Sequence, residues 1–502
     1  MAELLPSHTR RKGLVSISDV AQARALTAAG RLQGEHGRDV NVWRGVPYAR
    51  PPVGPLRFAP PEPPQPWSGV RDATHFGAVA PQVPSHPLLA EDGPQSEDCL
   101  TLNVWAPASP GPHPVLVWIH GGALVTGSGR RPTYDGTSFA RHGVVLVTLN
   151  YRLGPLGFLY LGEAAPGSAN VGLLDQVAAL TWIARNIGTF GGDPGRVTVA
   201  GESAGALSVA TLLCMPAARG LFQQAILESF IPVYRDRAQA DRDTRQVLDR
   251  LAIRGDALSA LRATPVETLL AAYQRGVAWP TVDGTTLPQT LWETIASGRS
   301  MKVPLLVGSN KDEIRLWSAL DPAWHTDDPK KLVALFEQTW GPITAVEHTH
   351  YVAGRGGPDL FNGLMQLGTM RAFQFPAQRL AAAQAHEAPT WVYRFDWESP
   401  AFDGRLKACH AMELPFVFNT WDAPGTELLT GSSPDRSHLA DQMHQAWIAF
   451  AQHGDPNTPA LPLWPPYDAG MRPTMLFASE SRVAEDPDAA ARQLQEQLQT
   501  VP

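Results

Sequence analysis

Runs of consecutive apolar residues recur along the chain and alternate with segments in which apolar residues have helical spacing. A continuous apolar run predicts a strand buried on both faces of a parallel sheet, because a strand with one exposed face would alternate polar and apolar residues. The strands predicted in this way are Pro114–His120, Gly143–Tyr151, Arg196–Ala200, Gln224–Ser229, Val303–Asn310 and Thr390–Trp397.

Two segments have the periodicity of helices. Asp175–Ile187 predicts a crossover helix, and Ser437–Asp455 predicts a helix with a serine cap at its start and a glycine stop at its end. Strands and helices alternate as they do in a doubly wound α/β protein. We therefore expect a large, mostly parallel central sheet flanked by helices, with insertions.

The stretch Tyr48–Trp67 contains so many prolines that it cannot form a regular helix or a central strand. Phe58 and Trp67 lie among these prolines, which predicts an ordered coil packed on a core. A chain of 502 residues is long enough for up to about three domains, or for one large α/β domain with insertions. Because no internal repeat and no clear linker is visible, we expect residues 1–502 to form a single domain.

Composition and charge narrow the class of protein. The net charge is −7, from 41 Lys and Arg against 48 Asp and Glu, and there is no long basic run, so nucleic acid is not an expected partner. Three scattered cysteines are too few for a disulfide framework or a zinc site and suggest a reducing compartment. Neither a secretory signal nor a membrane span is visible, so we expect a soluble cytoplasmic protein.

The segment VTVAGESAGALSV (Val197–Val209) predicts a strand that passes directly into a helix, with Ser203 at the sharp turn. In such a turn Gly201 and Gly205 are required, because a Cβ atom at either position would collide with the neighbouring strand or helix. The pattern G-x-S-x-G alone arises by chance in roughly one chain in six of this length. Its position at the carboxyl end of a predicted parallel strand, where such folds bind ligands, favours a nucleophilic serine.

A serine nucleophile needs a base of near-neutral pKa and a carboxylate that orients this base. In folds with this turn the partners follow in the order serine, acid, histidine. Asp312 and Glu313 come directly after a predicted strand, and these residues alone do not decide between them. His410 lies in a non-helical stretch after the next predicted strand and is the favoured base.

Other histidines compete with His410. His444 and His453 fall in the last predicted helix, where a solvated or partly packed role is expected. His348 and His350 have the pattern of surface residues, with a chance metal pair as the alternative.

The segment WIHGGALVTGSG, which follows a predicted strand, has the pattern of an oxyanion loop. A phosphate-binding loop is the alternative, but neither Lys-Ser nor Lys-Thr follows, and no G-x-G-x-x-G opens a helix there. The expected amide donors are Gly122, Ala123 and Ala204, while Gly121 is expected to let the chain turn.

Taken together, these motifs resemble the type-B carboxylesterases, a family that includes cholinesterase-like enzymes and bacterial para-nitrobenzyl esterases. The resemblance covers nearly the whole chain, through Trp43–Pro61, Ser96–Pro107, Trp118–Ala123, Asn150–Leu159, Ala169–Ala206, Val307–Glu313 and Cys409–Phe418. It implies the α/β-hydrolase fold, Ser203 as nucleophile, Glu313 rather than Asp312 as the acid, and His410 as the base.

The resemblance also assigns structural roles. It implies two structural salt bridges, which are Arg57 with Glu97 and Arg152 with Asp175. In secreted members of the family, the cysteine that matches Cys99 forms a disulfide with an earlier cysteine. Ala80 stands at the partner position here, so Cys99 is expected to be a free, buried thiol. The loop Pro81–Asp98 contains no aromatic residue, which disfavours a choline-binding cage and cholinesterase activity.

Several residues near the nucleophile are candidates for the substrate pocket: Leu124, Phe230, Leu316 and Trp317. Phe230 stands where relatives usually have glycine, and it either crowds the acyl pocket or packs in the core. For Leu316 and Trp317 an ordinary core role is the alternative. Glu202, beside the nucleophile, either tunes His410 electrostatically or has a structural role in the turn.

The sequence therefore predicts a serine carboxylesterase that acts on a small-molecule ester without metal or organic cofactor, as a monomer or small homo-oligomer. Because a protonated histidine cannot act as a base, activity is expected to fall below about pH 6. The alternatives are an amide or carbamate hydrolase with the same residues, a non-catalytic cholinesterase-like binding protein, and a lipase. The binding protein is disfavoured because all three catalytic residues are in place, and the lipase because no apolar lid helix is evident.

Overall fold

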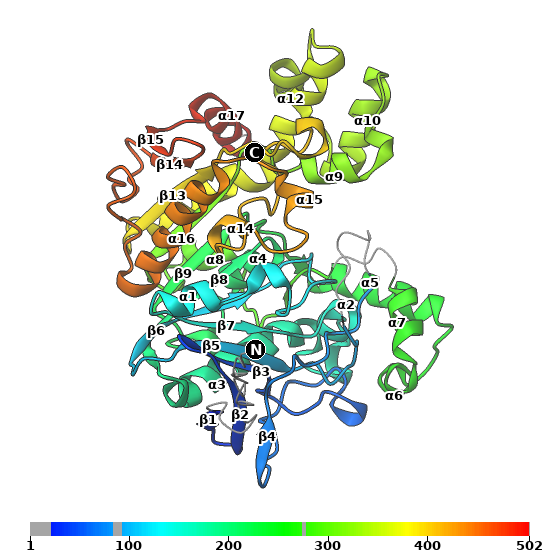
Figure 1. Cartoon of the computed structure of the whole chain (residues 1–502). Coiled ribbons are helices and arrows are strands. Elements are labelled where there is room, and N and C mark those ends of the chain that lie inside the picture. Colours follow the sequence, from blue (N-terminus) through cyan, green and yellow to red (C-terminus); the bar gives the residue numbers. More distant parts are fainter. Residues whose placement is uncertain (1–21, 84–92, 274–277, 501–502) are drawn as a thin grey trace, which may run out of the picture.

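A twisted sheet runs through the computed structural model, which describes residues 22–83, 93–273 and 278–500 (Figure 1). The order of the paired strands is β1-β2-β3-β5-β7-β6-β8-β9-β12-β13-β14-β15, and β4 pairs with β2. These strands are β1 Gln22–Leu26, β2 Arg31–His36, β3 Val40–Pro47, β4 Val70–Asp72, β5 Thr101–Pro107, β6 His113–Ile119, β7 Val145–Leu149, β8 Gly192–Glu202, β9 Gln224–Glu228, β12 Leu305–Asn310, β13 Thr390–Phe395, β14 Pro473–Phe477 and β15 Arg482–Glu485. The short strands β10 (Arg235–Asp236) and β11 (Thr281–Val282) form a separate parallel pair.

The centre of the large sheet is parallel and its margins are antiparallel. Strands β7, β6, β8, β9, β12, β13 and β14 pair in parallel with one another, whereas β1, β2, β3 and β5 on one side and β15 on the other pair antiparallel. The short strand β4 is an exception at the margin, since it pairs in parallel with β2. All six predicted strands are present, and their ends differ from the prediction by a few residues. The largest difference is at β8, which begins at Gly192 rather than Arg196.

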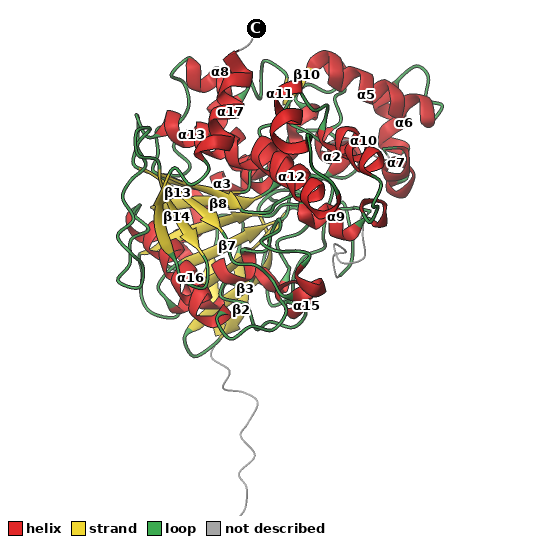
Figure 2. Ribbon diagram, turned by 90° about the horizontal axis from the view of Figure 1, so that it is seen from above, coloured by secondary structure: helices red, strands yellow, loops and turns green. Residues whose placement is uncertain are grey.

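Helices cover both faces of the sheet, as Figure 2 shows with α16 on one side and α3 and α13 on the other. The helices are α1 Thr137–Arg141, α2 Gly154–Phe158, α3 Val171–Asn186, α4 Ala204–Leu212, α5 Arg237–Arg250, α6 Ala257–Ala263, α7 Val266–Ala272, α8 Leu291–Ala296, α9 Arg315–Leu320, α10 Pro329–Trp340, α11 Ala345–Glu347, α12 Gly357–Thr369, α13 Phe375–Gln384, α14 Leu414–Val417, α15 Glu427–Thr430, α16 Arg436–His453 and α17 Ala489–Thr500.

Alternate residues of the central strands enter two different cores, because successive side chains of a strand point to opposite faces. In β6, Val115 and Val117 pack in the core that includes residues of α3, α4 and α13. Leu116 and Trp118 pack in the second core, with residues of α14 and α16. This double burial explains why the central strands have continuous apolar sequences.

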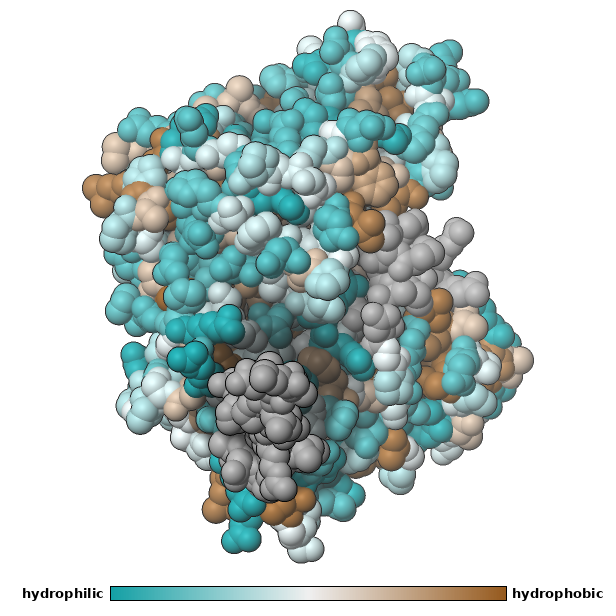
Figure 3. All heavy atoms as spheres, viewed as in Figure 1, coloured by the Kyte–Doolittle hydropathy of each residue, from teal (hydrophilic) through white to brown (hydrophobic). Residues whose placement is uncertain are grey.

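The helices α9, α10 and α12 form part of an insertion with an apolar cluster of its own. They lie with α5, α6 and α7 on the same side of the molecule in Figures 1 and 2. On the face seen in Figure 3, hydrophilic residues predominate and apolar residues occur in small groups among them. Within the described ranges, no helix is both long enough and apolar enough to cross a membrane.

Two local predictions can be compared with the structure. The proline-dense segment forms an ordered coil, interrupted by a short 3₁₀ turn at Gly54–Leu56, and Phe58 is buried in the core. The predicted serine cap of the last helix is wrong, since α16 begins at Arg436 and has no side-chain cap at its start. The glycine stop is confirmed, because Gly454 ends the helix with a φ of 72°.

Candidate active site

Ser203 lies at the sharp turn between β8 and α4, with φ 57° and ψ −120°. A non-glycine residue rarely adopts this conformation, and such strain is concentrated at functional sites. A Cβ atom on Gly201 would lie 2.6 Å from the backbone carbon of Gly205, and one on Gly205 would collide with the carbonyl oxygen of Ile119. The two glycines therefore let strand, turn and helix approach β6 closely enough to expose the serine.

Neighbouring parallel strands place further polar groups beside this turn. The Ser203 amide donates to the carbonyl oxygen of Glu228 at the end of β9, at 2.8 Å. The next residue, Ser229, donates its amide to Gly308 of β12, also at 2.8 Å. Asn310 ends β12, and Glu313 follows three residues later. The carboxyl ends of three adjacent strands thus meet around one point.

Glu313 and His410 are in direct contact. The Nδ1 atom of His410 lies 2.6 Å from Oε2 of Glu313, and the His410 amide donates to the Glu313 carbonyl oxygen at 3.1 Å. The competing acid, Asp312, instead accepts a hydrogen bond of 3.1 Å from Arg315 Nε. The geometry therefore selects Glu313 as the carboxylate beside the imidazole.

The second oxygen of the Glu313 carboxylate is also held. Oε1 accepts hydrogen bonds of 2.6 Å from the Ser229 hydroxyl and of 2.6 Å from the Asn310 amide. The side chain is fully buried, so these donors replace the water that a charged carboxylate requires. Ser229 and Asn310 were not among the predicted site residues, although each stands at the end of a predicted strand.

The second ring nitrogen of His410, Nε2, lies against Glu202. Oε1 of Glu202 lies 3.0 Å from Nε2 of His410, and both side chains are more than nine-tenths buried. Burial lowers the pKa of His410, but the charges of Glu202 and Glu313 raise it by more, so the pKa lies well above its ordinary value. An activity that needs neutral His410 would therefore decline at a higher pH than the value of about 6 expected from an unperturbed histidine.

Ser203, Glu202 and His410 line one cavity of about 180 Å³, which we call the Ser203 cavity. Within the described ranges, the Ser203 hydroxyl makes no hydrogen bond to His410. Such bonds are often long or misaligned in unliganded enzymes and tighten when substrate binds.

Gly122 and Ala123 form one rim of the Ser203 cavity, and Ala204 is the first residue of α4. The amides of Gly122 and Ala123 donate no hydrogen bond within the described ranges, and the first amides of a helix lack partners in the helix. Ala123 has a φ of 55°, which is strained for a residue with a side chain. All three predicted donor residues thus lie next to Ser203.

The predicted role of Gly121 needs correction. It does not have a positive φ, so the turn itself does not require glycine there. Instead, a Cβ atom at this position would lie 2.7 Å from Oε2 of Glu202 and 3.1 Å from Cβ of Ser203. Gly121 is therefore needed for close approach to the residues that flank the nucleophile position.

A second cavity of about 160 Å³ adjoins the first, and we call it the Leu428 cavity. The two cavities share the lining residues Arg131, Tyr134, Leu316, His410, Ala411 and Leu414. The second is otherwise mostly apolar, and Phe402, Leu406, Leu428 and Leu429 are among its lining residues. A substrate at Ser203 can therefore extend in two directions from the reacting carbon.

Two of the four predicted pocket residues lie at these cavities. Leu316 lines both, and Trp317 lines the Ser203 cavity with its ring centroid 4.9 Å from that of His410. The prediction is wrong for Leu124 and Phe230, which are fully buried in the core and line neither cavity. For Phe230, the structure thus favours core packing over crowding of the acyl side.

Two more buried carboxyl groups, Glu228 and Glu413, lie behind the imidazole. Oε1 of Glu228 accepts a hydrogen bond of 2.7 Å from Trp447 Nε1, and Glu413 accepts one from the side-chain amide of Asn310. Burial, together with the charges of Glu202 and Glu313, raises the pKa of Glu413 to about 8. Burial and the charge of Glu413 raise the pKa of Glu228 well above its ordinary value. Glu413 could have been noticed in the sequence, since it follows His410 by only three residues.

The histidines that compete with His410 in the sequence lie away from this site. His444 is fully buried, with hydrogen bonds of 2.8 Å to Val417 and 2.8 Å to Ser138, so the predicted solvated or partly packed role is wrong. Its pKa is lowered to about 4 by burial. His348, His350 and His453 are exposed, as predicted. The described ranges contain no group of three His, Cys, Asp or Glu side chains arranged to hold a metal ion.

The structural roles that the resemblance implied agree with the structure. Arg57 Nε lies 2.7 Å from Glu97, and Arg152 donates to Asp175 at 2.8 and 2.6 Å. Cys99, Cys214 and Cys409 are all buried free thiols. Part of the loop Pro81–Asp98 and the first 21 residues lie outside the described ranges.

Comparison with known proteins agrees with this architecture. Residues 21–496 match the model of the carboxylesterase family. The chain is 41% identical to the para-nitrobenzyl esterase of Bacillus subtilis, over 93% of this chain and 97% of that protein. It is 38% identical to the phenmedipham hydrolase of Pseudarthrobacter oxydans, over 92% of this chain and 96% of that protein.

Solved structures show the same fold. The carboxylesterase Est55 of Geobacillus stearothermophilus superposes with a TM-score of 0.85 at 41% identity, covering 94% of this chain and 99% of that one. A para-nitrobenzyl esterase structure superposes with a TM-score of 0.84 at 40% identity, with the same coverage. The fold is thus the α/β-hydrolase fold, with a large and mostly parallel sheet flanked by helices. The chain belongs to the carboxylesterase family and is a carboxylic ester hydrolase.

Proposed function

We propose that the chain hydrolyses esters through an acyl-enzyme on Ser203, with His410 as general base and acid and Glu313 as the orienting carboxylate. The observation that carries this proposal is the contact of 2.6 Å between His410 Nδ1 and Glu313, with His410 lining the same cavity as Ser203. A carboxylate at Nδ1 keeps the proton on that nitrogen. Nε2, which lies 3.0 Å from Oε1 of Glu202, is then the nitrogen that accepts the serine proton.

In the first half of the reaction, His410 Nε2 takes the proton of the Ser203 hydroxyl as its oxygen attacks the ester carbonyl carbon. The carbonyl π bond opens, and the negative charge on its oxygen is stabilised by the amides of Gly122, Ala123 and Ala204. As the carbonyl re-forms, the bond to the alkoxy oxygen breaks, and the imidazolium gives its proton to the leaving alcohol. Glu313 stabilises the imidazolium through its short contact with Nδ1.

The second half repeats the sequence with water. His410 removes a proton from the attacking water, the same amides hold the charge, and Ser203 leaves the tetrahedral carbon with a proton returned by the imidazolium. Besides the ester, these steps consume only water, so we expect a chelator to leave the rate unchanged.

The size of the site favours compact esters. The Ser203 cavity and the adjoining Leu428 cavity have volumes of about 180 and 160 Å³, so they fit small substituents on either side of the ester. Amides and carbamates could use the same residues, but family membership favours esters. A single domain, a cytoplasmic location and a monomeric or small homo-oligomeric state stay predictions from the sequence.

Steady-state hydrolysis of 4-nitrophenyl acetate and butyrate, with matched carbamate and anilide compounds, tests the proposal. We expect ester turnover that a chelator does not inhibit, slower reaction of the other two classes, and loss of turnover in Ser203→Ala by at least about 10³-fold. Ser68→Ala is the control and should keep native turnover, since it changes an exposed serine that does not line the cavity. Retention of full activity by Ser203→Ala would show that the nucleophile is assigned wrongly.

A further inference from the structure

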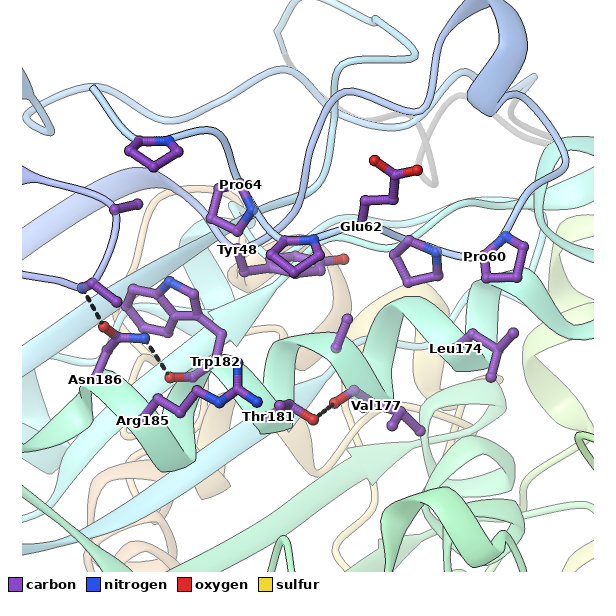
Figure 4. Close-up of a pocket in the computed structure, with 16 residues that line it drawn as sticks. Tyr48, Pro60, Glu62, Pro64, Leu174, Val177, Thr181, Trp182, Arg185 and Asn186 are labelled. Atoms are coloured by element: carbon purple, nitrogen blue, oxygen red, sulfur yellow. Dashed lines mark hydrogen bonds between the residues drawn. The ribbon is translucent and has the colours of Figure 1, made fainter. Parts of the chain in front are cut away.

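A third cavity, of about 470 Å³, lies between the proline-dense segment and α3, away from Ser203 (Figure 4). This volume is within the usual range of small-molecule sites, about 300 to 1,000 Å³. We call it the Trp182 cavity and define it by Tyr48, Pro60–Pro64, Pro66, Leu174, Val177, Trp182 and Arg185, which are among its lining residues. None of these residues lines either cavity at Ser203.

The two walls of the Trp182 cavity are apolar. Figure 4 shows the pyrrolidine rings of the segment on one side and the side chains of α3 on the other. Five prolines, at positions 60, 61, 63, 64 and 66, contribute to the first wall, and Leu174, Val177 and Ala178 to the second. Such surfaces gain free energy by covering an apolar ligand, because they give up no hydrogen bonds to water when they do so.

Most polar side chains around the cavity are already hydrogen-bonded within the protein. The Tyr48 hydroxyl donates to Asn150 at 2.7 Å, and Thr181 donates to Val177 at 2.8 Å. Asn186 accepts from the Ala28 amide and donates to Trp182, both at 2.8 Å. The Glu62 carboxylate is paired with Arg50. These groups therefore offer little to a ligand.

Two hydrogen-bond donors at the Trp182 cavity have no partner within the described ranges. The guanidinium of Arg185 is exposed and makes no ion pair or hydrogen bond within the described ranges. The indole Nε1 of Trp182 likewise donates no hydrogen bond to a described residue, although only 6% of this side chain is exposed. In Figure 4 the Trp182 nitrogen is directed toward the proline segment. The two residues are three positions apart on α3, so they lie on the same face of the helix.

The positive charge of Arg185 and the unpaired N–H group of Trp182, beside an apolar slot, indicate which chemical groups a ligand of this cavity would carry. A carboxylate accepts hydrogen bonds from both donors and neutralises the cation, while an apolar body fills the space between prolines and helix. We propose that the Trp182 cavity is a second binding site, separate from the catalytic one, for organic carboxylates with an apolar body. The acids released by ester hydrolysis are of this class, but the proposal does not depend on the catalytic assignment.

Calorimetric titration with 2-naphthoate tests this site, with 2-naphthamide as the neutral analogue of equal size. We expect saturable binding of the carboxylate with a dissociation constant of at most about 1 mM, and weaker binding of the amide. Octanoate and octanamide form a second pair with an alkyl body in place of the aromatic one, and octanoate should likewise bind more tightly than octanamide. No saturation by either carboxylate below about 10 mM would overturn the proposal, as would equal affinity for carboxylates and amides.

Substitutions in α3 test whether 2-naphthoate binds in the Trp182 cavity. Ala178→Trp fills the slot and should weaken 2-naphthoate binding at least tenfold, whereas Ala184→Trp, at an exposed position of the same helix outside the lining, should leave it unchanged. Arg185→Gln should weaken 2-naphthoate binding about fivefold, and Trp182→Phe should weaken it about threefold. The double variant should bind 2-naphthoate and 2-naphthamide with nearly equal affinity. Unchanged binding in Ala178→Trp would contradict the assignment.

Hydrolysis by these variants separates this proposal from the catalytic one. Ala178→Trp should retain native turnover of 4-nitrophenyl butyrate, because the cavity shares no lining residue with the Ser203 cavity. If the variant keeps 2-naphthoate binding, the second site is refuted while the catalytic proposal stands. If sedimentation instead shows a dimer of the native chain that Ala178→Trp abolishes, the slot accommodates a second copy and the small-ligand proposal is wrong.

Discussion

Replacing Glu202 by glutamine removes a negative charge beside the imidazole of His410 while it keeps the size of the side chain. Glu202 Oε1 lies 3.0 Å from Nε2 of His410, in a region from which water is largely excluded. A carboxylate at this distance stabilises the charged imidazolium more than the neutral imidazole, so it raises the pKa of His410. We expect Glu202→Gln to lower this pKa.

The structure limits the size of the effect. Two unit charges 3.0 Å apart interact by about 5.5 kcal/mol at an effective dielectric constant of about 20, and we take this as the largest effect that the charge of Glu202 could have. The amide dipole of glutamine keeps part of this interaction, so we expect a shift of about 1 to 2 pKa units, within the range for one opposite charge nearby. One pH unit below the native pKa, the neutral fraction of His410 would then rise from about 9% to between about 50 and 90%.

The sign of the pH dependence follows from the role of the imidazole. Only neutral His410 accepts the serine proton, so kcat/KM is lost as the pH falls through the pKa of this group. Because that pKa is raised in the native enzyme, the loss should occur above the ordinary range of histidine. In Glu202→Gln the same loss should occur about 1 to 2 pH units lower.

The assay is the initial rate of 4-nitrophenyl butyrate hydrolysis from pH 5 to pH 9, under conditions that give kcat/KM. The position of the acidic limb is the readout, because a general loss of activity lowers the whole profile without moving it. Glu267→Gln, at an exposed position in α7, is the matched control and should leave the limb in place. Coincident limbs in Glu202→Gln and the native enzyme would refute the electrostatic role of Glu202.

Three further substitutions give distinct outcomes. Ser229→Ala removes a hydrogen bond of 2.6 Å to the buried Glu313 carboxylate and should lower kcat about tenfold with little change in KM, as steady-state kinetics would show; an unchanged kcat would contradict a positioning role. Gly205→Ala places a Cβ atom against the backbone of β6 and should cost about 3 kcal/mol of stability in denaturant unfolding, whereas Gly188→Ala, with no atom within 4 Å, should cost much less; equal losses would refute the steric argument. Burial raises the pKa of Glu413 to about 8. Between about pH 4.5 and pH 8, Glu413 therefore holds a proton in the folded protein that it has lost in the unfolded chain. The free energy of unfolding then falls by up to about 1.4 kcal/mol for each pH unit in this range. Glu413→Gln should therefore reduce the fall in Tm from pH 5 to pH 8, and parallel Tm curves would count against the raised pKa.

The features that the sequence predicted well are those that depend on residues near one another in the chain. The turn at Ser203 requires glycine two positions to either side, and the collisions at Gly201 and Gly205 are the ones the motif implied. The central strands were recognisable because burial on both faces makes their sequences continuously apolar. The position of Gly122 and Ala123 at the Ser203 cavity likewise follows from the glycine pair after β6.

Contacts between distant segments were harder to predict. The residues alone did not decide between Asp312 and Glu313, and the structure distinguishes them through Arg315, which pairs with Asp312. The burial of His444 depends on packing of α16 against α1 and α14, which a helical pattern does not reveal. An apolar residue near the nucleophile can face either the core or the cavity, which is why Leu316 lines the cavity while Phe230 does not.

The sequence predicted only part of the site, because the residues that support the imidazole and its carboxylate come from several strands. Ser229 reaches Glu313 only because β9 and β12 are neighbours in the sheet, and the order of strands is not written in any one segment. Glu413 and Glu228 meet near the imidazole from different parts of the chain. Their pKa values are raised because the two carboxyl groups are buried close to other acidic groups, and no local sequence pattern indicates this.

Covalent labelling with a fluorophosphonate, followed by intact-mass measurement and peptide mapping, tests most directly whether hydroxyl, imidazole and carboxylate act as one unit. The account predicts a single phosphonyl group on Ser203 of the native enzyme, none on Ser203→Ala, and labelling at least about 100-fold slower in His410→Ala. A label on another residue, or full-rate labelling without the imidazole, would contradict it.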